Sequence, residues 1–270
     1  MQNRFIEVEL SHAGICRLSL NRPEKHNAFH PEMMQEIINA LHQLQHDEQV
    51  RVLVLTGNGK SFSSGADLNY MKSMVKFDHA ENVGDARRLA SLLQSLNEFS
   101  RPVISAVNGN AFAGAIGLIA CSDIIVAASD AAFCISETRL GIAPAVISPY
   151  VVNRIGIHYA RRYFLTAEVF NAETARQMNL VHEVVAPGDL LATAYGHAAQ
   201  LLNNSPDAIS ATKRLIHRIS PAGNRELADF TCELIARLRA GDEGQQGLAA
   251  FFDKTSPPWV PDPESQQDQS

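Results

Sequence analysis

Cysteine is scarce in this sequence and is not arranged for pairing or metal binding. The 270 residues include four cysteines, and no two of them form a Cys-x-x-Cys pair. Short cysteine spacings are typical of zinc sites and redox pairs, and dense cysteine frameworks are typical of small secreted domains. We therefore expect neither a disulfide framework nor a metal site, and we expect the reducing cytoplasm as the location.

Motifs for dinucleotides and metals are also missing. No Gly-x-Gly-x-x-Gly follows a candidate strand, and the ten histidines show no recognisable ligand spacing. The glycine motif binds the pyrophosphate of a dinucleotide, and closely spaced histidines bind metal ions. We therefore expect no nicotinamide, flavin or metal cofactor.

An excess of positive charge is absent as well. The chain has 23 Lys and Arg against 29 Asp and Glu, which gives a net charge of −6. Nucleic acids and anionic membranes attract basic surfaces, so we expect neither as the main partner. The N-terminus has no basic stretch followed by an apolar one, so we expect no secretory signal.

One uncharged run, residues 102–122, has about the length of a membrane span. It is interrupted by Asn108-Gly109-Asn110, and polar loop backbone is costly inside a bilayer. Its two halves have the lengths of a buried strand (103–107) and a buried helix (114–121). We interpret the run as part of a protein core.

Strand and helix patterns alternate along the first 150 residues. Expected strands cover 15–20, 52–56, 103–107, 124–127 and 132–135, and expected helices begin at Pro31, carry apolar residues through 89–99 and cover 114–121. This alternation predicts a mixed α/β core with parallel crossovers. The chain then becomes mostly helical, with helices at 172–178 (capped by Asn171), 206–219 (begun by Ser205-Pro206), 230–238 and 244–252.

Two stretches of small residues, 61–68 and 107–115, are the strongest functional signal. Gly65-Ala66 and Ala113-Gly114-Ala115 allow backbone N–H groups to approach a ligand closely. Such donors suit an atom that becomes negative during a reaction, as in an oxyanion hole. A lone Glu137 follows and is a candidate acid/base. Together these residues predict enolate stabilisation.

Six segments in the same order make the chain resemble the enoyl-CoA hydratase/isomerase (crotonase) superfamily. They are 20–28, 62–68, 106–114, 121–124, 133–141, and 205–208 with Lys213. The resemblance implies an α/β spiral of repeated strand-strand-helix turns over residues 1–195 and a helical oligomerisation region over 196–260. It also implies a homotrimer or hexamer (dimer of trimers) and an acyl-CoA substrate, whose coenzyme A is the only cofactor-like group. Residues 261–270 form a polar tail that we expect to be disordered.

By position in the family motifs, the backbone amides of Ala66 and Gly114 would hold the thioester oxygen, and Glu137 would be the acid/base. Coenzyme A would meet the residues Lys25, His26 and Ala28, the backbone of Asp67 and Leu68, and, in a neighbouring subunit, Phe251 and Lys254. The alternatives are ordinary: a loop residue at 66, a packed helix start at 114, an ion pair of Glu137 with Arg139, a solvated Lys25 and simple packing of Phe251.

At two positions the sequence differs from common members of the family, and both differences bear on which reaction is expected. Gly117 stands where hydratases of the family commonly carry a first glutamate, so Glu137 must move both protons alone or share the work with ordered water. Ala145 stands where isomerases and dehalogenases often carry an acid, which favours a hydratase. Burial against Phe133, Ile135 and Leu140 is expected to raise the pKa of Glu137.

Segments 133–150 and 66–71 are similar to methylglutaconyl-CoA and carboxygeranoyl-CoA hydratases of leucine and acyclic-terpene breakdown. This similarity predicts hydration of a branched enoyl-CoA whose distal carboxylate meets Lys72, Arg87 or Arg88. The alternatives are a general straight-chain hydratase or isomerase of fatty-acid β-oxidation, a lyase that cleaves a hydroxyacyl-CoA, and a scaffold that binds acyl-CoA, RNA or a protein partner without turnover.

Overall fold

The computed structural model describes residues 3–74, 77–140 and 142–219, together with isolated positions between 242 and 259. The helix expected at 230–238 and the tail at 261–270 lie outside the described residues. The helix expected at 244–252 is described only at residues 246 and 250. Phe251 and Lys254, expected at a neighbour's coenzyme A, also lie outside them.

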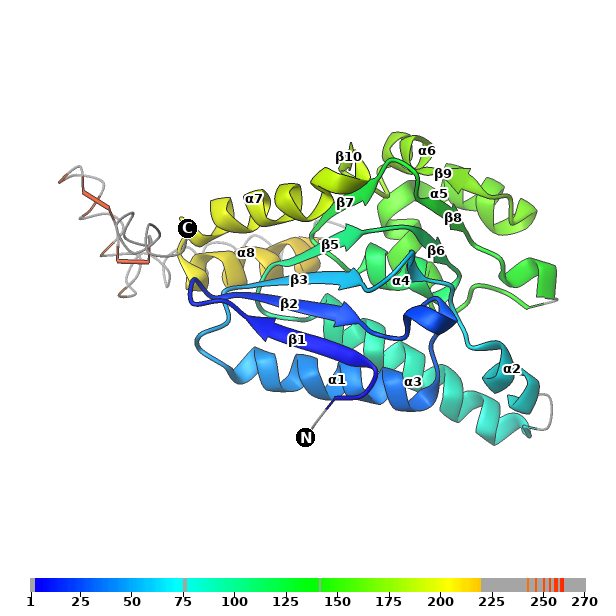
Figure 1. Cartoon of the computed structure of the whole chain (residues 1–270). Coiled ribbons are helices and arrows are strands. Elements are labelled where there is room, and N and C mark those ends of the chain that lie inside the picture. Colours follow the sequence, from blue (N-terminus) through cyan, green and yellow to red (C-terminus); the bar gives the residue numbers. More distant parts are fainter. Residues whose placement is uncertain are drawn as a thin grey trace.

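Two sheets form the centre of the molecule (Figure 1). The larger one has the order β1-β2-β3-β5-β7-β10, in which β1 is antiparallel to β2 and the other neighbours are parallel. Its strands are β1 (Ile6–Leu10), β2 (Ile15–Leu20), β3 (Val52–Gly57), β5 (Val103–Val107), β7 (Ile124–Ala128) and β10 (Glu183–Val185). The smaller sheet consists of β4 (Ser61–Ser63), β6 (Asn110–Phe112), β8 (Ala132–Cys134) and β9 (Phe170–Asn171).

Each turn of the chain contributes one strand to each sheet. β3 leads into β4, β5 into β6 and β7 into β8, and a helical segment follows each pair. The described helices are α1 (Pro31–His46), α2 (Leu68–Met74), α3 (His79–Asn97), α4 (Gly114–Ala120), α5 (Ser148–Thr166), α6 (Ala172–Gln177), α7 (Leu190–Leu202) and α8 (Pro206–Ile219), with shorter 3₁₀ turns η1 (Pro23–Lys25), η2 (Glu137–Leu140) and η3 (Pro187–Asp189). The expected spiral of strand-strand-helix turns is confirmed.

Helix ends follow the capping chemistry that the sequence predicted. The Asn171 side chain accepts a hydrogen bond from the Thr174 amide at 2.8 Å, and α6 starts there. The Ser205 hydroxyl accepts one from the Ala208 amide at 3.2 Å at the start of α8. In both cases a side-chain oxygen satisfies an amide that has no partner inside the helix.

The larger sheet is apolar on both faces because helices cover both. Val52 and Val54 of β3 belong to a cluster with α7, whereas Leu53 and Leu55 belong to the cluster with α1, α3 and α4. Figure 1 shows α7 on one side of this sheet and α1 and α3 on the other. Alternate residues of one strand therefore serve two different cores.

The uncharged run 102–122 lies in the interior, where β5 and α4 are almost wholly buried. No helix in the described ranges is long and apolar enough to cross a membrane. α7 runs through residue 195, where we expected the core to give way to the oligomerisation region, and Ala194 and Ala198 both pack on the sheet. That division of the chain remains a prediction.

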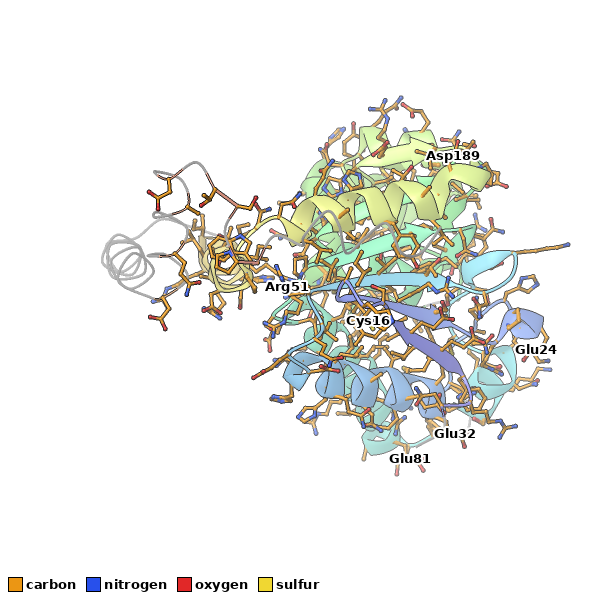
Figure 2. All side chains as sticks on the ribbon, turned by 60° about the vertical axis from the view of Figure 1, so that its left-hand side comes forward. Cys16, Glu24, Glu32, Arg51, Glu81 and Asp189 are labelled. Atoms are coloured by element: carbon orange, nitrogen blue, oxygen red, sulfur yellow. The ribbon has the colours of Figure 1, made fainter. Side chains whose placement is uncertain are left out.

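Among the described cysteines, Cys16, Cys121 and Cys134 are buried free thiols. Figure 2 shows Cys16 within the molecule, whereas Glu32, Glu81 and Asp189 lie at its periphery. Burial raises the pKa of the Cys16 thiol to about 12, with a smaller contribution from Asp47. The thiol is therefore protonated and unreactive at neutral pH.

A buried ion pair ties α8 to the core. The Lys213 ammonium donates to Asp123 Oδ2 at 2.6 Å and to the Arg101 carbonyl at 2.9 Å. The Val103 amide donates to the same carboxylate oxygen at 2.7 Å. The start of β5, the turn before β7 and α8 thus meet at one carboxylate.

Replacing Lys213 with methionine is expected to leave Asp123 without its counter-ion and to lower the free energy of unfolding by about 2 kcal/mol. Breaking a buried pair typically costs about 3–5 kcal/mol, and solvent access to Asp123 reduces this cost. Urea unfolding checks the value. Arg176→Met, which removes the exposed pair with Glu173, is the control and should leave the transition unchanged; equal losses in both variants would contradict the assignment.

Candidate active site

The predicted site residues follow the carboxyl ends of three neighbouring parallel strands. β4 pairs with β6, and β6 pairs with β8. Ala66 lies three residues after β4, Gly114 two residues after β6, and Glu137 three residues after β8. Since adjacent strands lie about 4.8 Å apart and run the same way, their ends lie at one edge of the sheet. The fold therefore brings the three predicted residues together.

The backbone around Ala66 is held by hydrogen bonds to Phe29. Ala66 forms an isolated parallel bridge with Phe29, in which the Phe29 amide donates to the Gly65 carbonyl at 2.7 Å and the Asp67 amide donates to the Phe29 carbonyl at 2.8 Å. In the described part of the chain the Ala66 amide donates to no backbone acceptor, and the residue is exposed. The close approach of Gly65 (φ 86°) to Ala113 keeps the second stretch of small residues alongside.

Gly114 begins α4, so its amide has no partner within the helix. The preceding Ala113 has φ 50° and ψ −121°, a conformation that an alanine rarely adopts. The Ala113 amide donates to the Cys134 carbonyl at 2.8 Å, which ties this strained residue to β8. A Cβ at Gly114 would lie 3.8 Å from both Leu89 and Phe29, so apolar side chains flank the amide.

Glu137 is half-buried at the first position of η2. Burial raises the pKa of its carboxyl group, and hydrogen bonding from its own amide and that of Ser136 opposes the rise. Its Oε2 is buried and has no hydrogen-bond partner among the residues that the structure describes. Arg139 is exposed, and within the described chain it forms no ion pair with Glu137. The alternative role of Glu137, an ion pair with Arg139, is therefore not observed in the described chain.

The position of the missing glutamate is filled by apolar side chains. A Cβ at Gly117 would lie 2.7 Å from Ile147 Cγ2 and 3.1 Å from both δ-carbons of Leu93. A larger residue there would require the side chains of Ile147, which precedes α5, and of Leu93 in α3 to shift. These two positions supply one carboxylate, that of Glu137, and the packing opposes a side chain at position 117. Ala145, at the position of the acid in other family members, is exposed and carries no ionisable group.

The loop expected to line coenzyme A lies beside the Ala66 segment. Lys25 and His26 are exposed, and His26 Nδ1 lies 3.0 Å from the Ser61 hydroxyl. Ala28 is buried and its carbonyl accepts from Arg22. Leu68 is 75% exposed, which leaves its backbone accessible to a ligand.

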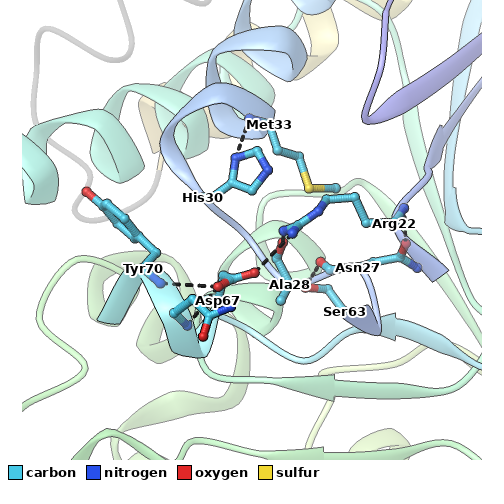
Figure 3. Close-up of polar contacts among 9 residues, drawn as sticks. Arg22, Asn27, Ala28, His30, Met33, Ser63, Asp67 and Tyr70 are labelled. Carbon is cyan, nitrogen blue, oxygen red and sulfur yellow. Dashed lines mark hydrogen bonds and ion pairs between the residues drawn. The ribbon is translucent and has the colours of Figure 1, made fainter. Parts of the chain in front are cut away.

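Asp67 has a role that the sequence analysis missed. Its carboxylate pairs with Arg22 at 3.0 Å and accepts from the amides of Asn69 and Tyr70, as Figure 3 shows for Arg22 and Tyr70. The pKa of Asp67 is lowered because these hydrogen bonds and the Arg22 charge outweigh its desolvation. Arg22 lies in segment 20–28, one of the segments that resemble the family. The sequence did not reveal that its partner, Asp67, lies 45 residues away.

Of the three cations considered for a distal carboxylate, Lys72 and Arg87 are exposed. Arg88 pairs with Asp85 at 3.2 Å, and the Tyr70 hydroxyl donates to the same Asp85 oxygen at 2.5 Å. Burial and Asp85 raise the pKa of Tyr70 to about 12, which keeps this hydroxyl protonated. This cluster links α2 to α3 close to Leu89, which flanks Gly114.

A cavity of about 870 Å³ opens elsewhere, between the end of α4, α5, α6 and α8. Its charged walls include Arg154, which donates to the Ser122 carbonyl, and the Lys213–Asp123 pair. None of the predicted site residues lines it. The described residues contain no group of three or more His, Cys, Asp or Glu that could hold a metal ion.

Comparison with known proteins gives a consistent result. A family model described as Enoyl-CoA hydratase/isomerase matches residues 11–262. The fold is similar to that of an enoyl-CoA hydratase from Shewanella pealeana, with a TM-score of 0.92 and 44% identity over 95% of this chain and 96% of that one. The chain is 32% identical to the 2,3-dehydroadipyl-CoA hydratase of Escherichia coli, covering 90% and 94% of the two chains. It is 30% identical to the short-chain-enoyl-CoA hydratase of Clostridium acetobutylicum, covering 94% and 96%.

These matches confirm the predicted α/β fold class, the superfamily resemblance and the prediction of an enzyme, a hydro-lyase. The roles of Ala66, Gly114, Glu137 and the coenzyme A residues stay predictions, as does the narrower similarity to methylglutaconyl-CoA and carboxygeranoyl-CoA hydratases.

The packing at Gly117 predicts opposite effects of one substitution at two helical glycines. Gly117→Ala should lower the free energy of unfolding by about 1–2 kcal/mol, because the clash outweighs the helix preference of alanine. Gly196→Ala in α7, where nothing lies within 4 Å of the new Cβ, should raise it by up to about 1 kcal/mol. Urea unfolding measures both, and a stabilising Gly117→Ala would show that the site has room.

The raised pKa of Glu137 predicts a pH-dependent stability. Above the ordinary carboxyl value of 4.5, the folded state holds a proton more tightly than the unfolded state, so stability falls as pH rises through the folded pKa. Glu137→Gln should therefore have a higher melting temperature than the unsubstituted protein at neutral pH, with the gap closing in acid. Glu48→Gln, at an exposed position, is the control. Parallel curves for Glu137→Gln and the unsubstituted protein would contradict the desolvation of Glu137.

Proposed function

We propose that this chain, which belongs to the enoyl-CoA hydratase/isomerase family, adds water across the α,β double bond of an enoyl-CoA thioester. One observation carries the proposal. At the shared edge of β4, β6 and β8 lie two backbone amides that donate to no acceptor in the described ranges, and one desolvated carboxylate whose Oε2 has no partner there. The amides suit a developing oxyanion and the carboxylate suits proton transfer.

The amides of Ala66 and Gly114 would hold the thioester oxygen. Attack at the β-carbon pushes electrons onto that oxygen, so donors fixed there stabilise the enolate more than the starting thioester. Removing one such donor typically costs about 10² to 10³ in rate. Both donors are backbone groups, so their precision depends on the loops that carry them.

Glu137 would take a proton from water as the hydroxide oxygen bonds to the β-carbon. Glu137, directly or through ordered water, would then give this proton to the α-carbon as the thioester carbonyl re-forms, so that Glu137 ends ionised as it began. Its unpartnered Oε2 supports this role, because a carboxylate already bound to a cation would be a weaker base. With Gly117 packed against Ile147 and Leu93, Glu137 would do both transfers alone or with ordered water.

For the substrate we propose a branched enoyl-CoA with a distal carboxylate, such as methylglutaconyl-CoA in leucine degradation. The 2,3-dehydroadipyl-CoA hydratase relative supports this in part, because an adipyl group is dicarboxylic. Lys72, Arg87 or Arg88 would meet the carboxylate. The short-chain-enoyl-CoA hydratase relative supports the alternative, a general hydratase, equally well.

The assembly that we propose is a homotrimer or hexamer in the cytoplasm. In it, Phe251 and Lys254 of one subunit would reach the coenzyme A of a neighbour, with the lysine near a phosphate. The resemblance of the sequence to the family supports this arrangement.

Loss of enoyl-thioester ultraviolet absorbance tests the activity, with methylglutaconyl-CoA, crotonyl-CoA and a longer enoyl-CoA in parallel and product mass as the check. We expect turnover of all three and the highest kcat/KM for methylglutaconyl-CoA. Glu137→Gln should lose roughly 10² to 10⁴ in kcat while still binding acyl-CoA. Equal or faster straight-chain turnover would overturn the branched substrate, and no turnover of any of the three would overturn the hydratase.

A further inference from the structure

We infer that Arg22 is a positioning residue that fixes the direction of the Ala66 amide. The inference rests on the proposed function, since it takes the Ala66 amide as the oxyanion donor. Arg22 acts through the backbone on either side of Ala66.

The direction of the Ala66 N–H is set by the carbonyl of the same peptide unit. In a trans peptide the C=O and N–H groups point in opposite directions. The Gly65 carbonyl accepts from the Phe29 amide at 2.7 Å, so the Ala66 N–H points away from Phe29. The Asp67 amide donates back to the Phe29 carbonyl at 2.8 Å. Two hydrogen bonds to one residue thus clamp the peptides on both sides of Ala66.

The guanidinium group of Arg22 connects the two segments that form this clamp. Arg22 Nη1 donates to the Ala28 carbonyl at 2.6 Å, next to Phe29 in the chain. Arg22 Nη2 donates to Asp67 Oδ2 at 3.0 Å, next to Ala66. Figure 3 shows Arg22 between Ala28 and Asp67. The rigid fork of arginine can make both contacts at once, which a lysine ammonium on a flexible stem cannot do with the same geometry.

The pair is protected from solvent. The side chains of Arg22 and Asp67 are 11% and 9% exposed, so their attraction is screened much less than that of a surface pair. The Arg22 amide donates to the Asn27 side chain at 2.8 Å, and Asn27 in turn donates to the Ser61 carbonyl at 2.8 Å. The arginine is therefore held at its backbone as well as at its head.

The two oxygens of Asp67 have separable tasks. Oδ2 meets Arg22, whereas Oδ1 accepts from the Asn69 amide at 2.8 Å and the Tyr70 amide at 3.1 Å at the start of α2. An asparagine side-chain oxygen caps a helix as well as a carboxylate does. Asp67→Asn therefore keeps the cap and removes the charge that Arg22 binds.

Two substitutions test the inference. Arg22→Lys and Asp67→Asn should each lower kcat on crotonyl-CoA by roughly 10- to 100-fold, because small misplacement of a catalytic group has effects of that order. KM should change little. Arg17→Lys alters a different arginine–carboxylate pair, with Glu9 on β1, and is the control with unchanged kcat.

The direct readout is the infrared carbonyl stretch of bound butyryl-CoA carrying a heavy-isotope label at the thioester carbonyl. This saturated thioester has no double bond to hydrate. On binding to the unsubstituted protein the stretch should move to lower frequency, because hydrogen bonds polarise the carbonyl. The shift should shrink in Arg22→Lys and Asp67→Asn, with the dissociation constant within about threefold, and should persist in Arg17→Lys.

The outcomes separate the two proposals. A full carbonyl shift and full kcat in both variants would overturn the positioning role while leaving the hydratase intact. Absence of any shift in the unsubstituted protein would overturn the Ala66 and Gly114 oxyanion site itself. If Arg22→Lys fails to fold, shown by circular dichroism, Asp67→Asn decides alone, since it keeps the α2 cap and removes no backbone group of the clamp.

Discussion

The parallel pairing of three short strands is the constraint on which the rest of the site depends. β4, β6 and β8 have three residues each and little core of their own. They stay aligned because each continues a longer strand of the larger sheet, whose two faces are covered by α7 on one side and α1, α3 and α4 on the other. The register of the larger sheet thus decides where the three loops end, and those loops carry the chemistry.

Several features at this edge are unfavourable for stability. Ala113 has a left-handed φ, Glu137 is desolvated, and within the described chain its Oε2 has no partner and two amides lack acceptors. Strain and unmet hydrogen-bonding capacity of this kind concentrate where a ligand completes the interactions. The surrounding backbone clamp and the well-packed sheets hold these groups in place when no ligand is bound.

Local patterns in the sequence predicted α1, α4, α6, α8 and the strands β2, β3, β5, β7 and β8, because each has an apolar run, an apolar period or a cap that can be read in one window. The helices α5 and α7 were expected only as part of a mostly helical region. The polar first half of α3 escaped, since Glu81 and Asp85 give no apolar period, although Asp78 caps the helix with Glu81 in a reciprocal pair. The strands β4 and β6 also escaped because three residues are too few to show alternation.

The sequence predicted the candidate site residues but not the residues that pack against them or hold them in place. Ala66, Gly114 and Glu137 came from short motifs, whereas the residues that define their surroundings are distant in sequence. Ile147 fills the space beside Gly117 from 30 positions away, and Arg22 reaches Asp67 across 45. No window of the sequence contains such pairs, and only the folded chain shows that the side chains of Ile147 and Leu93 pack against position 117.

The ion pair between Lys213 and Asp123 has a consequence for how the chain is made. Ninety residues separate the two partners, so a ribosome completes β5, α4 and β7 well before it adds the lysine. Until then the Asp123 carboxylate stays hydrated at the end of a largely formed sheet. Contacts this distant in sequence form late and slowly, so the docking of α8 would be among the last steps of folding during synthesis. In a chain stalled before residue 213, Asp123 and the start of β5 would stay accessible to water.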